Sequence, residues 1–156
     1  MKHRKGEHPW GDGVQMALLV LFMAVWLFDS FVLHAGRTMH GGVHWTLRLG
    51  VFILALAAAL ALFLSGRAAV RERERPAKVL RSGAFRWVRH PLYLSTLLVY
   101  FGLSFATLLP LALAVAVVAF IFYNYIAAFE EKVMAEKFGE EYKNYKAATG
   151  RWLPRL

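Results

Sequence analysis

The chain has 156 residues, of which 58% are hydrophobic, with 19 lysine and arginine residues against 10 acidic residues and no cysteine. A soluble domain of this length could hardly bury so much apolar sequence, so we exclude a soluble enzyme. The chain has no cysteine, which excludes a disulfide framework and a cysteine nucleophile. The net charge is +9, but the basic residues flank apolar segments, as they do in membrane proteins, which argues against nucleic-acid binding.

Two apolar segments in the first half of the chain are long enough to cross a bilayer. Residues 14–33 contain a single acidic residue, Asp29, and residues 47–64 are rich in Ala and Leu, which favours close helix packing. The segment before residue 14 is too short and too charged for an ordinary signal peptide, so we expect the first span to be retained.

Residues 91–129 are again almost wholly apolar, and as one straight helix they would extend about 58 Å. We therefore predict a helical hairpin, with a turn near Leu108–Leu111 because Pro110 favours a break. Residues 130–145 are compatible with a further helix, in which Gly139 marks a candidate break. The prediction is an all-α polytopic membrane protein with four transmembrane helices, a tight C-terminal hairpin and a cytosolic C-terminal helix.

The distribution of basic residues orients these spans. Residues 66–90 carry eight lysine and arginine residues, whereas residues 35–46 carry only Arg37, so the former loop and both termini are expected in the cytosol. We expect one membrane domain over residues 1–156, with two spans in 1–65 and a loop, hairpin and tail in 66–156. The lipid bilayer is the predicted partner, in a prokaryotic inner membrane, with the endoplasmic reticulum as the alternative.

Polar groups at membrane depth are mostly retained for function or for a partner, and few occur here. Asp29 is a candidate functional residue, the alternatives being a salt bridge or a side chain reaching toward the outer interface. His34, His40 and His44 lie on or beside the outer loop, but their spacing matches no compact ligand motif, so we predict no metal site.

Four polar residues are expected to meet at the inner interface. Pro91 suits the first turn of a helix, which places His90 and Tyr93 at the same helix end. Glu130 and Glu131 follow the last predicted span, so a tight hairpin would bring them opposite that pair. The alternative is that these side chains only cap and salt-bridge two helix ends.

These residues belong to a longer pattern: Leu80-x-x-Gly83-x-Phe85-x-x-x-Arg89-His90-Pro91-x-Tyr93, then Glu130-Glu131, Phe138-Gly139-Glu140-Glu141-Tyr142-x-x-Tyr145 and Trp152-Leu153-Pro154. Over about residues 76–154 the pattern resembles the superfamily of isoprenylcysteine carboxyl methyltransferases and phospholipid methyltransferases, integral-membrane enzymes that use S-adenosyl-L-methionine. The resemblance implies a cytosol-facing cofactor pocket and a lipophilic or small methyl acceptor. The implied cofactor-binding residues are Lys78, Val79, Leu80, Phe85, His90, Pro91, Leu92, Tyr93, Glu130 and Glu131. The implied catalytic residues are Glu130, Arg89 and Asn124.

One departure from this pattern bears on the acceptor. Where the prenylcysteine enzymes carry an arginine thought to meet the substrate carboxylate, this chain has Ile126, which cannot form a charge-assisted bond. Asn124 is a polar group near that position. The acceptor thus stays open among an isoprenylcysteine-like carboxylate, a neutral thiol, an amine and a phospholipid head group.

Two other functions remain as alternatives. Membrane sterol or enone reductases that use NADPH carry Arg-His-Pro-Asn-Tyr-x-Gly-Glu, but Leu92, Ser95 and Thr96 depart from that motif here. The second alternative is a non-catalytic membrane protein that has kept the fold.

Overall fold

A computed structural model describes residues 11–33, 42–71 and 78–155, and over these residues the regular elements are all helical. The five α-helices are α1 (Gly11–Phe28), α2 (Trp45–Arg71), α3 (Pro91–Thr107), α4 (Pro110–Phe138) and α5 (Glu140–Ala148). A π-helical segment, η1 (Asp29–Leu33), continues α1, and a 3-10 turn, η3 (Gly83–Arg86), precedes α3. The all-α class predicted from the sequence is confirmed for this part of the chain.

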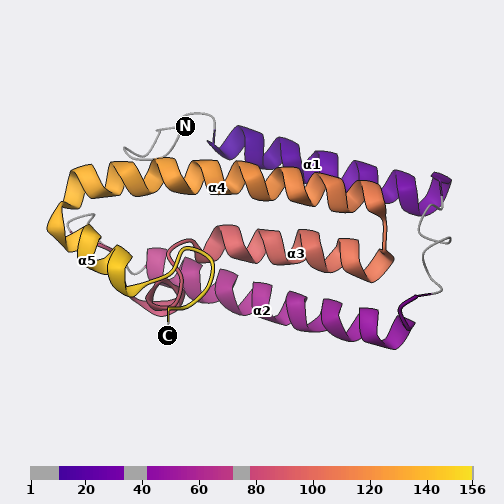
Figure 1. Cartoon of the computed structure of the whole chain (residues 1–156), viewed down its shortest axis with the longest axis horizontal. Helices are drawn as coiled ribbons and strands as arrows, with labels where there is room; N and C mark the ends of the chain where they lie inside the picture. Colours follow the sequence, from indigo (N-terminus) through magenta and orange to yellow (C-terminus); the bar gives the residue numbers. More distant parts are fainter. Residues whose placement is uncertain (1–10, 34–41, 72–77, 156) are drawn as a thin grey trace.

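The long helices run alongside one another in two pairs, α1 with α4 and α2 with α3, and α5 lies across one end of the bundle (Figure 1). The buried core lies between them and is built mainly from aromatic and small residues. Phe22 of α1 stacks on Tyr100 of α3 with ring centroids 4.5 Å apart, and both side chains are fully buried. Ala112, Ala116 and Ala119 face this core from α4 and allow the helices to approach closely.

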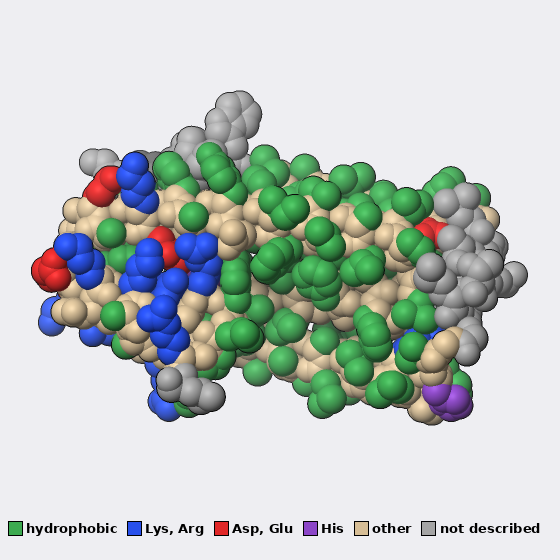
Figure 2. Space-filling model, in the orientation of Figure 1, with side chains coloured by type: hydrophobic (Ala, Val, Ile, Leu, Met, Phe, Trp, Pro, Cys, Tyr) green, Lys and Arg blue, Asp and Glu red, His purple; other side chains and the backbone are tan. Residues whose placement is uncertain are grey.

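Three helical stretches have the length and apolar composition needed to cross a membrane: Gly13–Val32, Trp45–Arg71 and Pro110–Phe138. The apolar helix α3 is shorter, with 17 residues, or about 25 Å. Hydrophobic side chains cover the middle of the molecule, whereas Lys and Arg gather at the end that carries α5 (Figure 2). Since such an apolar surface is stable only in lipid, the structure is that of an integral membrane protein.

The turn of the predicted hairpin is confirmed. Helix α3 ends at Thr107, Leu108 adopts a left-handed conformation with φ of 52°, and Pro110 opens α4 within its first turn. The predicted break at Gly139 is also present, where φ of 53° separates α4 from α5.

The boundaries of two spans differ from those predicted. Helix α4 does not end at Phe129 but runs on to Phe138, because residues 130–138 contain no glycine or proline. Glu130 and Glu131 therefore belong to the helix of the last span rather than to a separate tail. Helix α2 is also longer than the apolar segment and extends to Arg71.

The alanine-rich second span packs closely on α3, as its composition predicted. A Cβ atom placed on Gly102 would lie 3.1 Å from Cβ of Ala55 and 3.4 Å from the Phe52 ring. Gly66 makes a similar approach at the other end of α2, where Leu92 would lie 3.0 Å from an added Cβ. The short distance between α2 and α3 thus depends on glycine, which has no side chain, at these two contacts.

We predict that Gly102→Leu will destabilise the protein by about 1–3 kcal/mol, because the added side chain overlaps Ala55 and forces α2 from α3. The measurement is thermal unfolding of the detergent-solubilised protein. Gly50→Leu is the matched control, since it lies on α2 with no atom within 4 Å of an added Cβ. Equal unfolding temperatures for the two variants would contradict the prediction.

Candidate active site

The start of α3, the end of α4, α5 and the C-terminal segment lie at one end of the bundle (Figure 1). Charged and aromatic side chains from these segments contact one another there. Val88 and Gly150 form an isolated parallel bridge, and the Arg89 amide donates to the Gly150 carbonyl at 2.9 Å. This bridge holds residues after α5 directly beside the start of α3.

Glu131 is the centre of this region, with only 2% of its side chain exposed. Its carboxylate accepts hydrogen bonds from Arg89 Nε at 3.1 Å and from Arg151 Nε and Nη2 at 2.7 and 3.0 Å. Lys146 Nζ lies 3.2 Å from the same carboxylate. One buried anion thus connects α4 with the segment before α3, with α5 and with the C-terminal segment.

Arg89 has further partners that fix its position. Its Nη1 donates to the main-chain carbonyls of Lys146, at 3.2 Å, and Thr149. Arg89 therefore forms part of the wall of the site, and Glu131 balances its charge. These contacts are those expected of a residue that supports the structure of the pocket.

The predicted meeting of His90, Tyr93, Glu130 and Glu131 is present in the structure. Tyr93 donates its hydroxyl hydrogen to Glu130 Oε1 at 2.6 Å, and the His90 ring stacks on the Tyr93 ring at 5.6 Å. His90 Nδ1 lies 3.6 Å from Glu130 Oε2, and its Nε2 lies 3.5 Å from Glu131 Oε1. His90 occupies the N-cap position of α3, yet its side chain makes no capping hydrogen bond, so helix capping does not explain it.

The loop before α3 is held against α5. The Val79 amide donates to Glu141 Oε1 at 3.0 Å, and Arg81 Nη2 donates to the Glu141 carbonyl at 2.7 Å. Tyr145 donates its hydroxyl hydrogen to the Phe85 carbonyl at 2.6 Å. Burial raises the pKa of Tyr145 to about 12, so this hydroxyl keeps its proton at neutral pH.

The other sequence-predicted residues fall into two groups. Lys78, Val79, Leu80 and Phe85 lie in the loop on the α5 side, with Lys78 exposed and the other three half-buried. Pro91 and Leu92 lie on the side of Gly66 of α2, where their side chains would be 3.5 and 3.0 Å from a Cβ atom added to that glycine. The structure therefore brings His90, Tyr93 and the two glutamates together. The six residues of these two groups lie outside that cluster.

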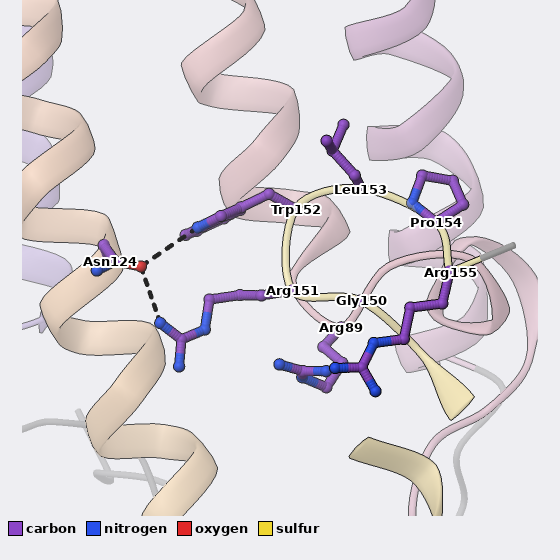
Figure 3. Close-up of a pocket in the computed structure, with 8 residues that line it drawn as sticks. All are labelled: Arg89, Asn124, Gly150, Arg151, Trp152, Leu153, Pro154 and Arg155. Atoms are coloured by element: carbon purple, nitrogen blue, oxygen red, sulfur yellow. Dashed lines mark hydrogen bonds between the residues drawn. The ribbon is translucent and has the colours of Figure 1, made fainter. Parts of the chain in front are cut away.

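An open pocket of about 510 Å³ lies beside this cluster (Figure 3). Its lining consists of Arg89, Asn124, Gly150, Arg151, Trp152, Leu153, Pro154 and Arg155. Asn124 Oδ1 accepts from Arg151 Nη1 at 2.8 Å and from Trp152 Nε1 at 3.3 Å. Asn124, a sequence-predicted site residue, thus faces the pocket, whereas Ile126 is 1% exposed and packs inside the protein.

Sequence reasoning missed Arg151 and Gln15. Arg151 directly precedes the Trp152-Leu153-Pro154 motif, a position that could have drawn attention to it. The Gln15 side chain lies near the Tyr93 hydroxyl, and it is the one polar residue between positions 14 and 28. An isolated amide in an apolar helix is a recognisable signal for a buried partner.

The remaining candidates lie away from this end. Asp29 is fully buried at the start of the π-helical segment, so its carboxylate does not reach toward the surface. His44 lies before α2, and His34, His40 and Arg37 fall outside the described residues. Within the described ranges no three His, Asp or Glu side chains group as a metal site would require.

We predict that Glu131→Gln will destabilise the protein by about 3–5 kcal/mol, because Arg89 would stay buried without its counter-charge. Unfolding in denaturant, followed in detergent, measures the loss. The matched control is Glu140→Gln, whose side chain is 77% exposed in its pair with Lys143 and should cost less than about 1 kcal/mol. A small loss for Glu131→Gln would show that the buried charges are not coupled.

Comparison with known proteins places this end of the bundle in a family. Methanethiol S-methyltransferase of Pseudomonas deceptionensis is 35% identical over 88 residues, which are 53% of this chain and 32% of that protein. The match thus spans about a third of the relative's length. The family described as phospholipid methyltransferase matches residues 50–141, from α2 through the hairpin into α5, and includes His90, Tyr93, Glu130 and Glu131. Because this match extends over more than half of the sequence, the chain belongs to the phospholipid methyltransferase family.

Proposed function

We propose that the protein transfers a methyl group from S-adenosyl-L-methionine to a small or lipophilic acceptor without charge, with a thiol as the favoured class. The observation that carries the proposal is the arrangement of Glu130. Its side chain is 18% exposed, accepts a hydrogen bond from Tyr93 and faces His90. Trp152 lines the pocket and also lies beside these residues, since its ring centroid is 5.9 Å from that of His90.

The side chains present fit this cofactor. A sulfonium cation is stabilised by a carboxylate and by aromatic faces, and Glu130, Tyr93 and Trp152 supply both. The pocket volume of about 510 Å³ lies in the range usual for small-molecule sites. When bound, S-adenosyl-L-methionine supplies an already activated methyl group, so the protein mainly has to align the acceptor and exclude water.

The residues of the cluster have different roles in the proposed reaction. Tyr93 fixes the orientation of the Glu130 carboxylate through the bond at 2.6 Å. A thiol acceptor loses its proton on methylation, and Glu130 is the carboxylate available to take that proton. Arg89 and Glu131 hold the surrounding segments in place and form no part of the proton path.

Two observations favour an acceptor without charge. Ile126, which stands where the prenylcysteine enzymes carry an arginine, is buried and apolar. Arg151, the cation beside Asn124, already donates from Nε, Nη1 and Nη2 to Glu131 and Asn124. Neither residue offers a free charge-assisted bond to an acceptor carboxylate. The relative from Pseudomonas deceptionensis acts, by its name, on a thiol.

The first test is a calorimetric titration of the detergent-purified protein with S-adenosylhomocysteine and, separately, with NADPH. We expect binding of S-adenosylhomocysteine alone, and Glu130→Gln should lower methyl transfer at least about 100-fold without changing thermal unfolding. Glu136→Gln, an exposed glutamate on the same helix, is the control and should keep full activity. Binding of NADPH alone would favour the reductase, and binding of neither would favour a non-catalytic protein.

We further propose that α3 crosses the bilayer with the three longer helices, so that both termini and the site face the cytosol in a prokaryotic inner membrane. The support is the clustering of Lys and Arg at the α5 end (Figure 2). Because the chain has no cysteine, Glu140→Cys and His44→Cys provide single labelling sites. In intact cells a membrane-impermeant maleimide should label only the His44→Cys variant, and labelling of Glu140→Cys would reverse the orientation.

A further inference from the structure

Trp152 is the aromatic residue of the C-terminal segment that lines the pocket. Its indole extends from that segment toward α4 (Figure 3), where Nε1 donates to Asn124 Oδ1 at 3.3 Å. The side chain is half-buried and packs against the core of the bundle. The proposed function uses its aromatic face only toward the sulfonium cation of the donor and gives it no role toward the acceptor.

The ring of Trp152 has neighbours of two kinds. On one side is His90 of the candidate site, with ring centroids 5.9 Å apart. On another side is Phe120 of α4, at 6.0 Å, whose side chain is 39% exposed on the apolar surface of the bundle. Phe120 in turn meets the edge of Phe101 from α3 at 6.4 Å. The indole therefore lies between the site and the apolar surface where α3 and α4 adjoin.

The position of this ring is fixed by its surroundings. Arg151, the preceding residue, is bound to Glu131 by two hydrogen bonds, and Gly150 is bridged to the start of α3. A Cβ atom on Gly150 would overlap the Leu153 carbonyl, so the segment bends tightly around Trp152. A large rigid side chain held at both its backbone and its Nε1 atom acts as a wall and not as a mobile lid.

We propose that Trp152 is the residue that determines acceptor size: its indole closes the site toward the bilayer between α3 and α4 and leaves room for a short acceptor beside His90. This inference rests on the proposed function, because it concerns the acceptor of that reaction. An acceptor that approaches from the lipid must pass the indole, so a longer chain on the acceptor meets the ring. A shortened side chain at position 152 would extend the site toward Phe120.

The test is the rate of methyl transfer from S-adenosyl-L-methionine to unbranched alkanethiols of one to eight carbons, with the purified protein in lipid nanodiscs. We expect kcat/KM of the wild-type protein to fall as the chain lengthens. In Trp152→Ala the ratio of kcat/KM for octanethiol to that for methanethiol should rise at least tenfold. A uniform loss at all chain lengths, with an unchanged ratio, would overturn the inference.

Two controls separate acceptor size from folding. Trp152→Phe retains an aromatic wall without the Nε1–H donor, and it should keep the preference for short thiols. Trp87→Ala removes a tryptophan that is 54% exposed and contacts Arg86, and it should leave the ratio unchanged. If Trp152→Ala fails to fold, Trp152→Leu replaces it: the smaller side chain should raise the ratio of octanethiol to methanethiol, and an unchanged ratio would overturn the inference. If the wild-type protein methylates no thiol of any length, the thiol function fails and this inference with it.

Discussion

The buried carboxylate of Glu131 is the contact on which the polar end of this protein depends. It brings Arg89, Arg151 and Lys146 together from three segments that the chain would otherwise leave separate. Burying a carboxylate is costly unless cations and hydrogen bonds compensate it, and here the partners do so while also closing the wall of the pocket. The same interaction fixes the C-terminal segment, and through it the position of Trp152.

Two adjacent glutamates on α4 have different environments because neighbouring helix residues point about 100° apart. Glu131 points inward to the cations and is almost fully buried, whereas Glu130 points toward Tyr93 and His90 and keeps 18% of its side chain exposed. Under the proposed function, the buried residue would support the structure of the site and the partly exposed residue would act on the ligand. Gln15 adds a contact to this arrangement from α1, which lies outside the family match.

Under the proposed function, the two reactants would differ in solubility, as the apolar surface and the polar end of the protein do. Hydrophobic side chains cover the middle of the face shown in Figure 2, and Lys and Arg gather at the α5 end. Three arginines, Arg89, Arg151 and Arg155, line the pocket. A water-soluble donor would reach the pocket from that end, and an acceptor dissolved in lipid would approach between helices. Trp152 lies between the two directions, in contact with His90 and with Phe120.

Local properties of the sequence determined the class of the protein, its apolar helices and the two breaks near Pro110 and at Gly139, because hydropathy, proline and glycine act within a few residues. The motif with His90, Tyr93 and the two glutamates was also recognisable, since a hairpin of known turn position brings its ends together. Only the tertiary structure decided that Arg151 and Lys146 compensate Glu131. It likewise decided that Trp152 reaches His90. These contacts depend on the path of the chain after α5, which is set by side chains distant in sequence and by no local pattern.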